Sequence, residues 1–397
     1  MRNAISRLWP PATALCFLAI FIASLTTEIA MRPGYDFAIF LAAGASVLHG
    51  LSPYVYSNLH ITEFLHHRAH GLLFPYLPWV AFVFAPLSPL GLIRALVVWD
   101  ILLAIAMFGA TFVWARSLNI RHPWFVGALA VLSAAAVHNY GLGQVSIFCL
   151  GFIVGALLAA RKGNMSLAGA LAVAAALLKP QDALVAPILV LVVALQFRGL
   201  RKAIAGEVAA ALTLLGLPLL AQPSILINWI HFELAFVHIP NPGGAAGIGL
   251  TSIGGWVGQT PMPSLKLIAL ALLVVAGATA GVILATRREG LAARSSWIIL
   301  APLTVWLLLT PDANQQDVVL VIPMLLLLIA DIRLSLLNRT LLVAIAIVAT
   351  STQEILMPRI SMAYDIDVVV LAALVMEIFV AWWPRSRSTN LIKSGDQ

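Results

Sequence analysis

The chain has 397 residues, of which 61% are hydrophobic and 10% are charged, and its mean hydropathy is +1.00. A soluble domain carries roughly 25% charged residues, so this composition excludes a water-soluble fold. The net charge of +7 does not indicate a nucleic-acid partner, because Lys and Arg form short clusters between apolar runs and no continuous basic stripe. Apolar runs near the length of a membrane helix recur without the alternation of a membrane barrel. The sequence therefore predicts an all-α polytopic membrane protein.

The apolar runs predict about twelve membrane-spanning helices in a single domain, 1–397. In chain order they lie at approximately 10–27, 95–115, 123–139, 145–160, 165–178, 183–197, 204–221, 264–285, 297–310, 318–330, 340–352 and 366–383. The first run follows Arg2 and Arg7 and lacks a small-x-small cleavage site, so we expect an uncleaved span. Cys16 and Cys149 fall inside apolar runs, which argues against a disulfide framework.

The segment 72–91 determines the topology. Its four prolines would interrupt a helix, so it is either one more span or a re-entrant or interfacial element. Lys and Arg concentrate in cytoplasmic loops, and 17 of the 23 basic residues fall on one side if this segment does not cross. We therefore expect a protein of the cytoplasmic (inner) membrane with both termini inside. The two long extracytoplasmic loops would be 28–94 and 222–263.

Asp36 stands just beyond the first span, at the start of an amphipathic run from Phe37 to Leu48. This run predicts a helix that lies in the membrane interface. Asp36 could stabilise the beginning of that helix through the dipole and the free amides, or it could be catalytic. Both interpretations stay open at this point.

The same loop contains His66, His67 and His70, which follow Glu63. Spacings of four residues place such side chains on one helical face, where a metal site is conceivable. A solvated loop helix is the commoner outcome, so we expect no metal and no other cofactor. Dependence on a divalent ion stays open.

Further polar residues lie at the predicted outer ends of spans. Lys179 and Asp182 occur in LLKPQDAL, and Asp317 occurs in TPDANQQD. Lys179 could bind a phosphate, or it could snorkel to the interface or pair with Asp182. Gln144 lies in the predicted turn HNYGLGQVS, where a hydrogen bond to a sugar is possible. Asp100 lies inside a predicted span, and its role stays open.

Several of these segments together resemble glycosyltransferase family 87, a group of GT-C membrane transferases that use sugars linked to polyprenyl phosphate. The resembling residues are Tyr35-Asp36-Phe37, Leu48-His49-Gly50, Pro53-Tyr54, Phe74-Pro75-Tyr76-Leu77-Pro78, Gly143-Gln144, Gly169 with Lys179-Pro180-Gln181, and Thr310-Pro311 with Asp317. The resemblance implies that Asp36 is the catalytic base. This sequence departs from the family pattern at 310–317, where relatives often have Ser-Pro followed by a His or aromatic residue.

The resemblance implies an inverting hexosyltransferase that moves a monosaccharide, with mannose as one candidate, from a polyprenyl-phosphate carrier to an extracytoplasmic lipid or glycan acceptor. One carboxylate base suffices for inversion when phosphate is the leaving group. Candidate contacts to the donor phosphate and sugar are Lys179, Gln144, Tyr35, Tyr76, Asp317 and Arg359. A secondary transporter or lipid-linked sugar flippase, and a non-catalytic membrane subunit, are the alternatives.

Overall fold

The computed structural model describes residues 34–59, 73–236, 291–309 and 315–330, together with the helical positions Leu18 and Ile22. Within these residues every regular element is a helix, which confirms the predicted all-α class. The remainder of the expected span 10–27 lies outside the described residues. So do the expected spans 264–285, 340–352 and 366–383, the three loop histidines His66, His67 and His70, and Arg359.

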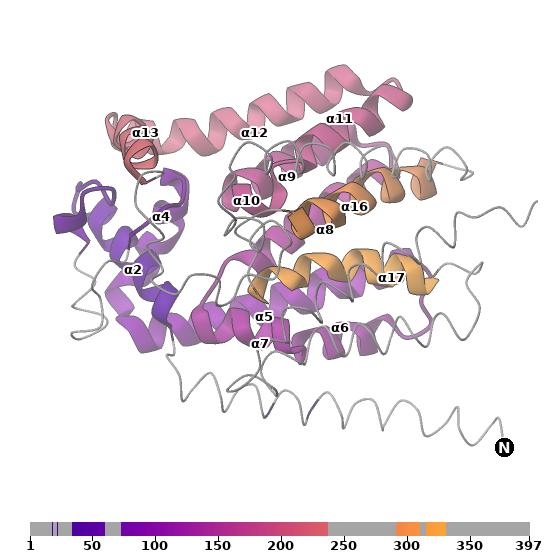
Figure 1. Ribbon diagram of the computed structural model, residues 1–397, viewed down its shortest axis with the longest axis horizontal. Coiled ribbons are helices and arrows are strands. Elements are labelled where there is room, and N and C mark those ends of the chain that lie inside the picture. The colour runs from indigo at the N-terminus through magenta and orange to yellow at the C-terminus, as the bar shows by residue number, and fades with distance from the viewer. Residues whose placement is uncertain are drawn as a thin grey trace, which may run out of the picture.

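Most of the helices run side by side in a bundle, and α2, α4 and α13 gather at one end of it (Figure 1). The α-helices are α2 (Tyr35–Leu48), α4 (Pro78–Phe84), α5 (Leu92–Ser117), α6 (Pro123–Val131), α7 (Ala134–Leu142), α8 (Ser146–Arg161), α9 (Met165–Leu178), α10 (Pro180–Ala183), α11 (Ala186–Gln196), α12 (Leu200–Ala221), α13 (Ile225–Phe236), α16 (Leu291–Leu309) and α17 (Ile322–Ala330). Short 3₁₀ helices are η1 (Tyr56–Asn58), η2 (Ala85–Leu90) and η3 (Gln315–Val321).

The helices α5 and α12 are long and apolar enough to cross a membrane. A third candidate is the pair α6 and α7, which is bent by 48° as a broken span or a re-entrant loop would be. The other apolar helices in the described part of the chain are shorter. Apolar membrane-capable helices are thus present, whereas the number of twelve spans stays a prediction.

The segment 72–91 forms two short helices rather than one long one. The helices α4 and η2 have 7 and 6 residues, well below the about 20 residues that a crossing helix needs. Proline begins α4 at a position where its missing amide is tolerated, and Pro89 lies within η2. The lengths favour a segment that does not cross.

The predicted helix after residue 35 is present as α2, and it is enclosed by protein. Seven consecutive residues, Phe37 to Ala43, are buried, whereas a helix lying in an interface keeps a polar face toward water. A Cβ atom on Gly44 would lie 2.7 Å from the carbonyl carbon of Phe84, so the backbones of α2 and α4 touch. The interfacial position of α2 stays a prediction.

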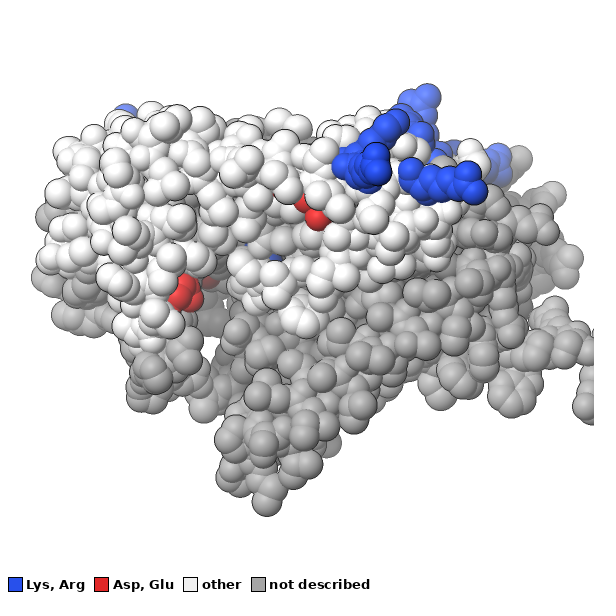
Figure 2. All heavy atoms as spheres, turned by 90° about the horizontal axis from the view of Figure 1, so that it is seen from above, with Lys and Arg blue, Asp and Glu red and all other residues white. Residues whose placement is uncertain are grey.

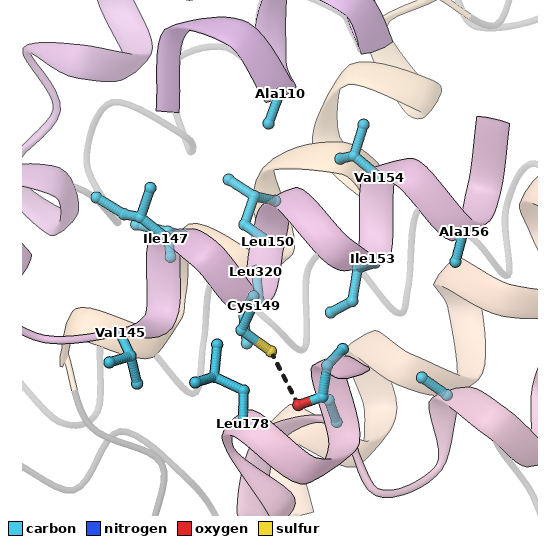
Figure 3. Packing of buried hydrophobic residues seen from close by; sticks show 14 of the residues in the cluster. Ala110, Val145, Ile147, Cys149, Leu150, Ile153, Val154, Ala156, Leu178 and Leu320 are labelled. Atoms are coloured by element: carbon cyan, nitrogen blue, oxygen red, sulfur yellow. Dashed lines mark hydrogen bonds between the residues drawn. The ribbon is translucent and has the colours of Figure 1, made fainter. Parts of the chain in front are cut away.

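The helix α8 lies in the middle of the bundle and is buried on several sides by α5, α9 and α16 (Figure 3). Its Cys149 Sγ lies 3.7 Å from the carbonyl oxygen of Ala175 in α9, and this cysteine is buried and free. The helix α9 also packs closely on α12. A Cβ atom on Gly206 would lie 1.9 Å from the carbonyl oxygen of Ser166, so only glycine permits this approach.

Charge is sorted between the two ends of the bundle. Most of the Lys and Arg side chains visible in Figure 2 gather at the end away from α2 and α4. The connections at that end carry the exposed residues Lys162, Arg198, Arg201 and Lys202. The α7–α8 turn, the α9–α10 break and the beginning of η3 lie at the opposite end. The chain direction therefore alternates along the bundle, whereas the sidedness of the two ends in a membrane stays a prediction.

Candidate active site

A glycine turn joins the beginning of α2 to the beginning of α8. Gly143 follows α7 with φ +71°, the left-handed conformation that favours glycine. A Cβ atom on it would lie 2.4 Å from Cβ of Phe37, so α2 and this turn are in direct contact. The Gly34 amide donates to the Gly141 carbonyl at 2.7 Å, and the Trp99 indole donates to the Gly143 carbonyl at 3.1 Å. This packing brings Asp36 to Gln144.

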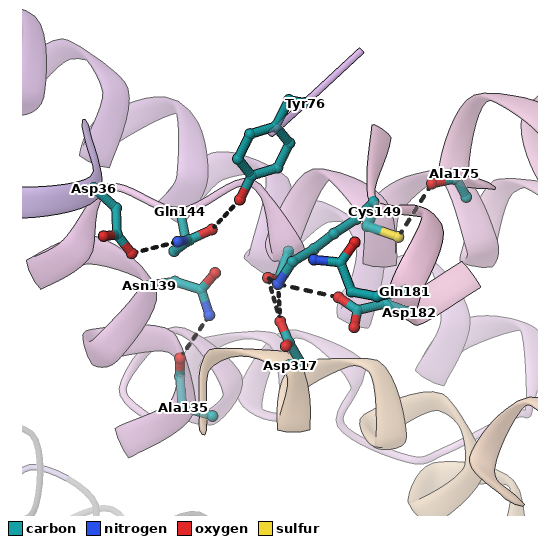
Figure 4. A network of polar contacts seen from close by, with 12 residues as sticks. Asp36, Tyr76, Ala135, Asn139, Gln144, Cys149, Ala175, Gln181, Asp182 and Asp317 are labelled. Carbon is teal, nitrogen blue, oxygen red and sulfur yellow. Dashed lines mark hydrogen bonds and ion pairs between the residues drawn. The ribbon is translucent and has the colours of Figure 1, made fainter. Parts of the chain in front are cut away.

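Asp36, Gln144 and Tyr76 form a chain of hydrogen bonds (Figure 4). Gln144 Nε2 donates to Asp36 Oδ2 at 2.5 Å, and the Tyr76 hydroxyl donates to Gln144 Oε1 at 3.2 Å. Burial raises the pKa of Tyr76 above its ordinary value, so this phenol keeps its proton. Gln144 is buried, whereas Asp36 is half-buried and lies in the first turn of α2, where the helix dipole favours a carboxylate.

A second group of polar side chains surrounds Lys179, in the break between α9 and α10 (Figure 4). The Lys179 ammonium forms ion pairs with Asp182, at 3.1 Å, and with Asp317, and it donates to Ser146 Oγ at 2.9 Å. Ser146 Oγ donates to Asp317 Oδ1 at 2.7 Å. These four side chains are at most 2% exposed. We call them the Lys179 cluster.

The ammonium group in this cluster stays charged. Burial alone would lower the pKa of Lys179, but Asp182 and Asp317 outweigh that effect and raise it. An ammonium group has three hydrogens to donate, and three partners surround this one. The cluster joins the beginning of α8, the α9–α10 break and η3 into one unit.

The structure brings together Asp36, Gln144 and Tyr76 in one group and Lys179 and Asp317 in the other. Tyr35 begins α2, and Arg359 lies outside the described residues. Asp100 lies in α5, where its Oδ1 is buried without a hydrogen-bond partner among the described residues. It belongs to neither group.

Ser146 belongs to the site although the sequence did not single it out. It begins α8 two residues after Gln144, and only its contacts to Lys179 and Asp317 reveal it. In the described part of the chain, no group of three or more His, Cys, Asp or Glu side chains could hold a metal ion.

The comparison with protein families adds one match. The model of glycosyltransferase family 87 matches residues 74–311, which include Tyr76, Gln144 and Lys179 but neither Asp36 nor Asp317. Searches of curated proteins and of solved structures find no match. Because the family match covers more than half of the chain, the chain belongs to glycosyltransferase family 87.

Proposed function

We propose that this glycosyltransferase moves a monosaccharide, with mannose as the first candidate, from a polyprenyl-phosphate carrier to an extracytoplasmic lipid or glycan acceptor. Asp36 is the general base. The observation that carries the proposal is the half-buried Asp36 carboxylate, which accepts a hydrogen bond from Gln144, a residue inside the segment that matches the family. The transfer proceeds with inversion of the anomeric carbon.

In the proposed step the acceptor hydroxyl oxygen attacks the anomeric carbon and its proton passes to Asp36. The bond between that carbon and the phosphate oxygen breaks, and polyprenyl phosphate leaves with the electron pair. Phosphate is a competent leaving group, so one correctly placed carboxylate is sufficient. A carboxylate nucleophile would be needed for retention, not for inversion.

Exposure supports Asp36 over the other two carboxylates. A base must come within hydrogen-bond reach of the hydroxyl whose proton it takes. Asp182 and Asp317 are 0% and 2% exposed and pair with Lys179, whereas Asp36 is half-buried. Of these three, Asp36 is the carboxylate that an acceptor can approach with the least rearrangement.

The donor would be held by Lys179, Tyr35, Asp317 and Arg359 in this proposal. For Lys179, direct contact with a phosphate requires that the phosphate replaces one of the three present partners of the ammonium group. A lysine that binds phosphate makes this exchange of partners, and a purely structural lysine does not. The stability and the donor KM of Lys179→Met separate these two roles.

The sorting of charge supports an extracytoplasmic site. The Asp36 end of the bundle lies away from the exposed basic connections, which the positive-inside tendency assigns to the cytoplasm. Nucleotide sugars are not supplied outside the inner membrane, so a lipid carrier is the fitting form of the donor there.

The test is transfer by purified protein in detergent, with radiolabelled polyprenyl-phosphate mannose as donor and a membrane lipid extract as acceptor. Asp36→Asn should lower transfer by about 10²- to 10⁴-fold, the contribution of a general base. Glu207→Gln changes a carboxylate in α12, outside both polar groups, and should retain activity. Full activity of a folded Asp36→Asn protein would refute the assignment.

The second candidate is a transporter or lipid-linked sugar flippase, which the half-buried Asp100 in the membrane-capable helix α5 favours. It predicts movement of the labelled lipid across sealed vesicles without a new covalent product. A transferase makes product in detergent, where no gradient exists.

A further inference from the structure

The hydrogen-bond chain at Asp36 has a fixed direction. A side-chain amide has one acceptor end and one donor end. The ionised Asp36 carboxylate can only accept, so Gln144 must turn Nε2 toward it, and Gln144 Oε1 then accepts from the protonated Tyr76 phenol. If the amide were reversed, Oε1 would face the carboxylate, and two acceptors would repel each other.

We propose that Tyr76 and Gln144 are positioning residues, which hold the Asp36 carboxylate in place and in its ionised form, rather than contacts to the sugar. The proposal rests on the proposed role of Asp36 as the base. A hydrogen bond donated to a carboxylate stabilises its charged form. The hydrogen bonds of Tyr76 and Gln144 therefore keep the Asp36 carboxylate deprotonated to a lower pH. They also fix the side from which a proton can reach this carboxylate.

Each member of the chain is itself anchored by the backbone around it. The Tyr76 carbonyl accepts a hydrogen bond from the Tyr54 hydroxyl at 2.7 Å, and the Tyr76 ring packs on Phe40 of α2 with ring centroids 4.8 Å apart. Gln144 follows the glycine turn that contacts Phe37. The positions of both side chains are thus set by α2, the element that carries Asp36.

Other titratable groups lie on the elements packed against α2, and the changes to Tyr76 and Gln144 leave them in place. The elements packed on α2 contribute Arg94 and Asp100 from the near part of α5 and His138 and Tyr140 from α7. The Lys179 cluster lies beyond Tyr76 and interacts with it electrostatically. A shift of the acid limb in Tyr76→Phe or Gln144→Met is therefore separable from the effects of these groups, because both variants retain all of them.

The experiment records transfer against pH, together with the donor KM, in the assay with labelled polyprenyl-phosphate mannose. Tyr76→Phe and Gln144→Met should move the acid limb of the kcat/KM profile upward, by about one to two pH units for Gln144→Met. The kcat should fall by roughly 10- to 100-fold, as for a misplaced catalytic group, and the donor KM should stay within about twofold. Because both changes break one chain, the double variant should be little worse than Gln144→Met.

Tyr140→Phe is the matched control. Its hydroxyl also donates one hydrogen bond of 3.2 Å, to the Val131 carbonyl, and it is outside the chain. It should leave the acid limb in place.

Melting in detergent identifies the variants that fold. If the folded variants keep the acid limb of the natural protein and instead raise the donor KM, the residues contact the sugar and the proposal is wrong. If Asp36→Asn is active, the proposed role of Asp36 as the base is wrong, and the positioning role is wrong with it. If Asp36→Asn is inactive while the limb does not move in Tyr76→Phe and Gln144→Met, only the positioning role fails.

Discussion

The two polar groups at the α2 end of the bundle hold their carboxylates in opposite ways. Asp36 is half-buried and accepts a hydrogen bond from the neutral amide of Gln144, whereas Asp182 and Asp317 are almost fully buried and paired with the charge of Lys179. A neutral hydrogen bond leaves a carboxylate able to accept a proton at modest cost. A buried ion pair resists any change of charge, because the remaining partner would be left unpaired. The first arrangement suits proton transfer and the second suits a structural link.

Removing the cation should produce the largest loss of stability. Lys179→Met leaves Asp182 and Asp317 buried without their common partner, which should cost about 3–5 kcal/mol in the free energy of unfolding. Denaturant unfolding in detergent measures it. Unchanged stability would break the comparison. A strongly raised donor KM of the folded variant would support the proposed contact between Lys179 and the donor phosphate.

The second expectation concerns the backbone that supports Asp36. Gly143→Ala places a methyl group against Phe37 in a left-handed conformation, so it should cost about 1–2 kcal/mol for the conformation and about 1–3 kcal/mol for crowding. Gly50→Ala is the control, since Gly50 has φ +70° but open space around its Cα. It should show the conformational cost alone. Equal losses at the two positions would mean that the contact with Phe37 is not tight.

Replacing the whole charged cluster should cost less than removing its cation. With Lys179→Met, Asp182→Leu and Asp317→Leu combined, no buried charge remains unpaired in the cluster, and stability should return to within about 1–2 kcal/mol of the natural protein. Unfolding of the triple variant beside the single one gives the difference. If the triple variant is the less stable of the two, the cluster does more than balance charge.

The smallest effect is expected at Glu207. This side chain lies on α12, and its Oε1 is buried without a hydrogen-bond partner among the described residues. Glu207→Gln should therefore change the free energy of unfolding by no more than about 0.5 kcal/mol, or stabilise the protein slightly. A loss as large as that of Lys179→Met would show that carboxylates outside the two groups are equally important.

The helices were largely predictable because membrane helices are long apolar runs separated by short loops. The predicted span 165–178 coincides with α9, and 95–115 lies within α5. The bend between α6 and α7 was missed, because an alanine-rich run remains apolar across it. Ser133 gave a signal for that bend, since its side chain accepts from the Ala136 amide as an N-cap.

The site was only partly predictable, for a geometric reason. Pairing of Lys179 with Asp182 was an expected alternative, because three residues separate them along the chain. Asp317, by contrast, lies 138 residues from Lys179, and Gln144 lies 108 residues from Asp36. Those contacts depend on how helices pack, and above all on the space left by Gly143 beside Phe37. No local sequence pattern predicts such a space.

The touching backbones of α2 and α4 at Gly44 have a kinetic consequence. Asp36 lies in the first turn of α2 and Tyr76 lies two residues before the beginning of α4, so both are attached to the same pair of packed helices. With no side chain between the two backbones, there is no soft layer in which a hinge could open. In the proposed reaction, Asp36 and Tyr76 therefore need no closing motion to meet, and we expect the slow events of the cycle to be the diffusion of donor and acceptor toward a site that is already assembled.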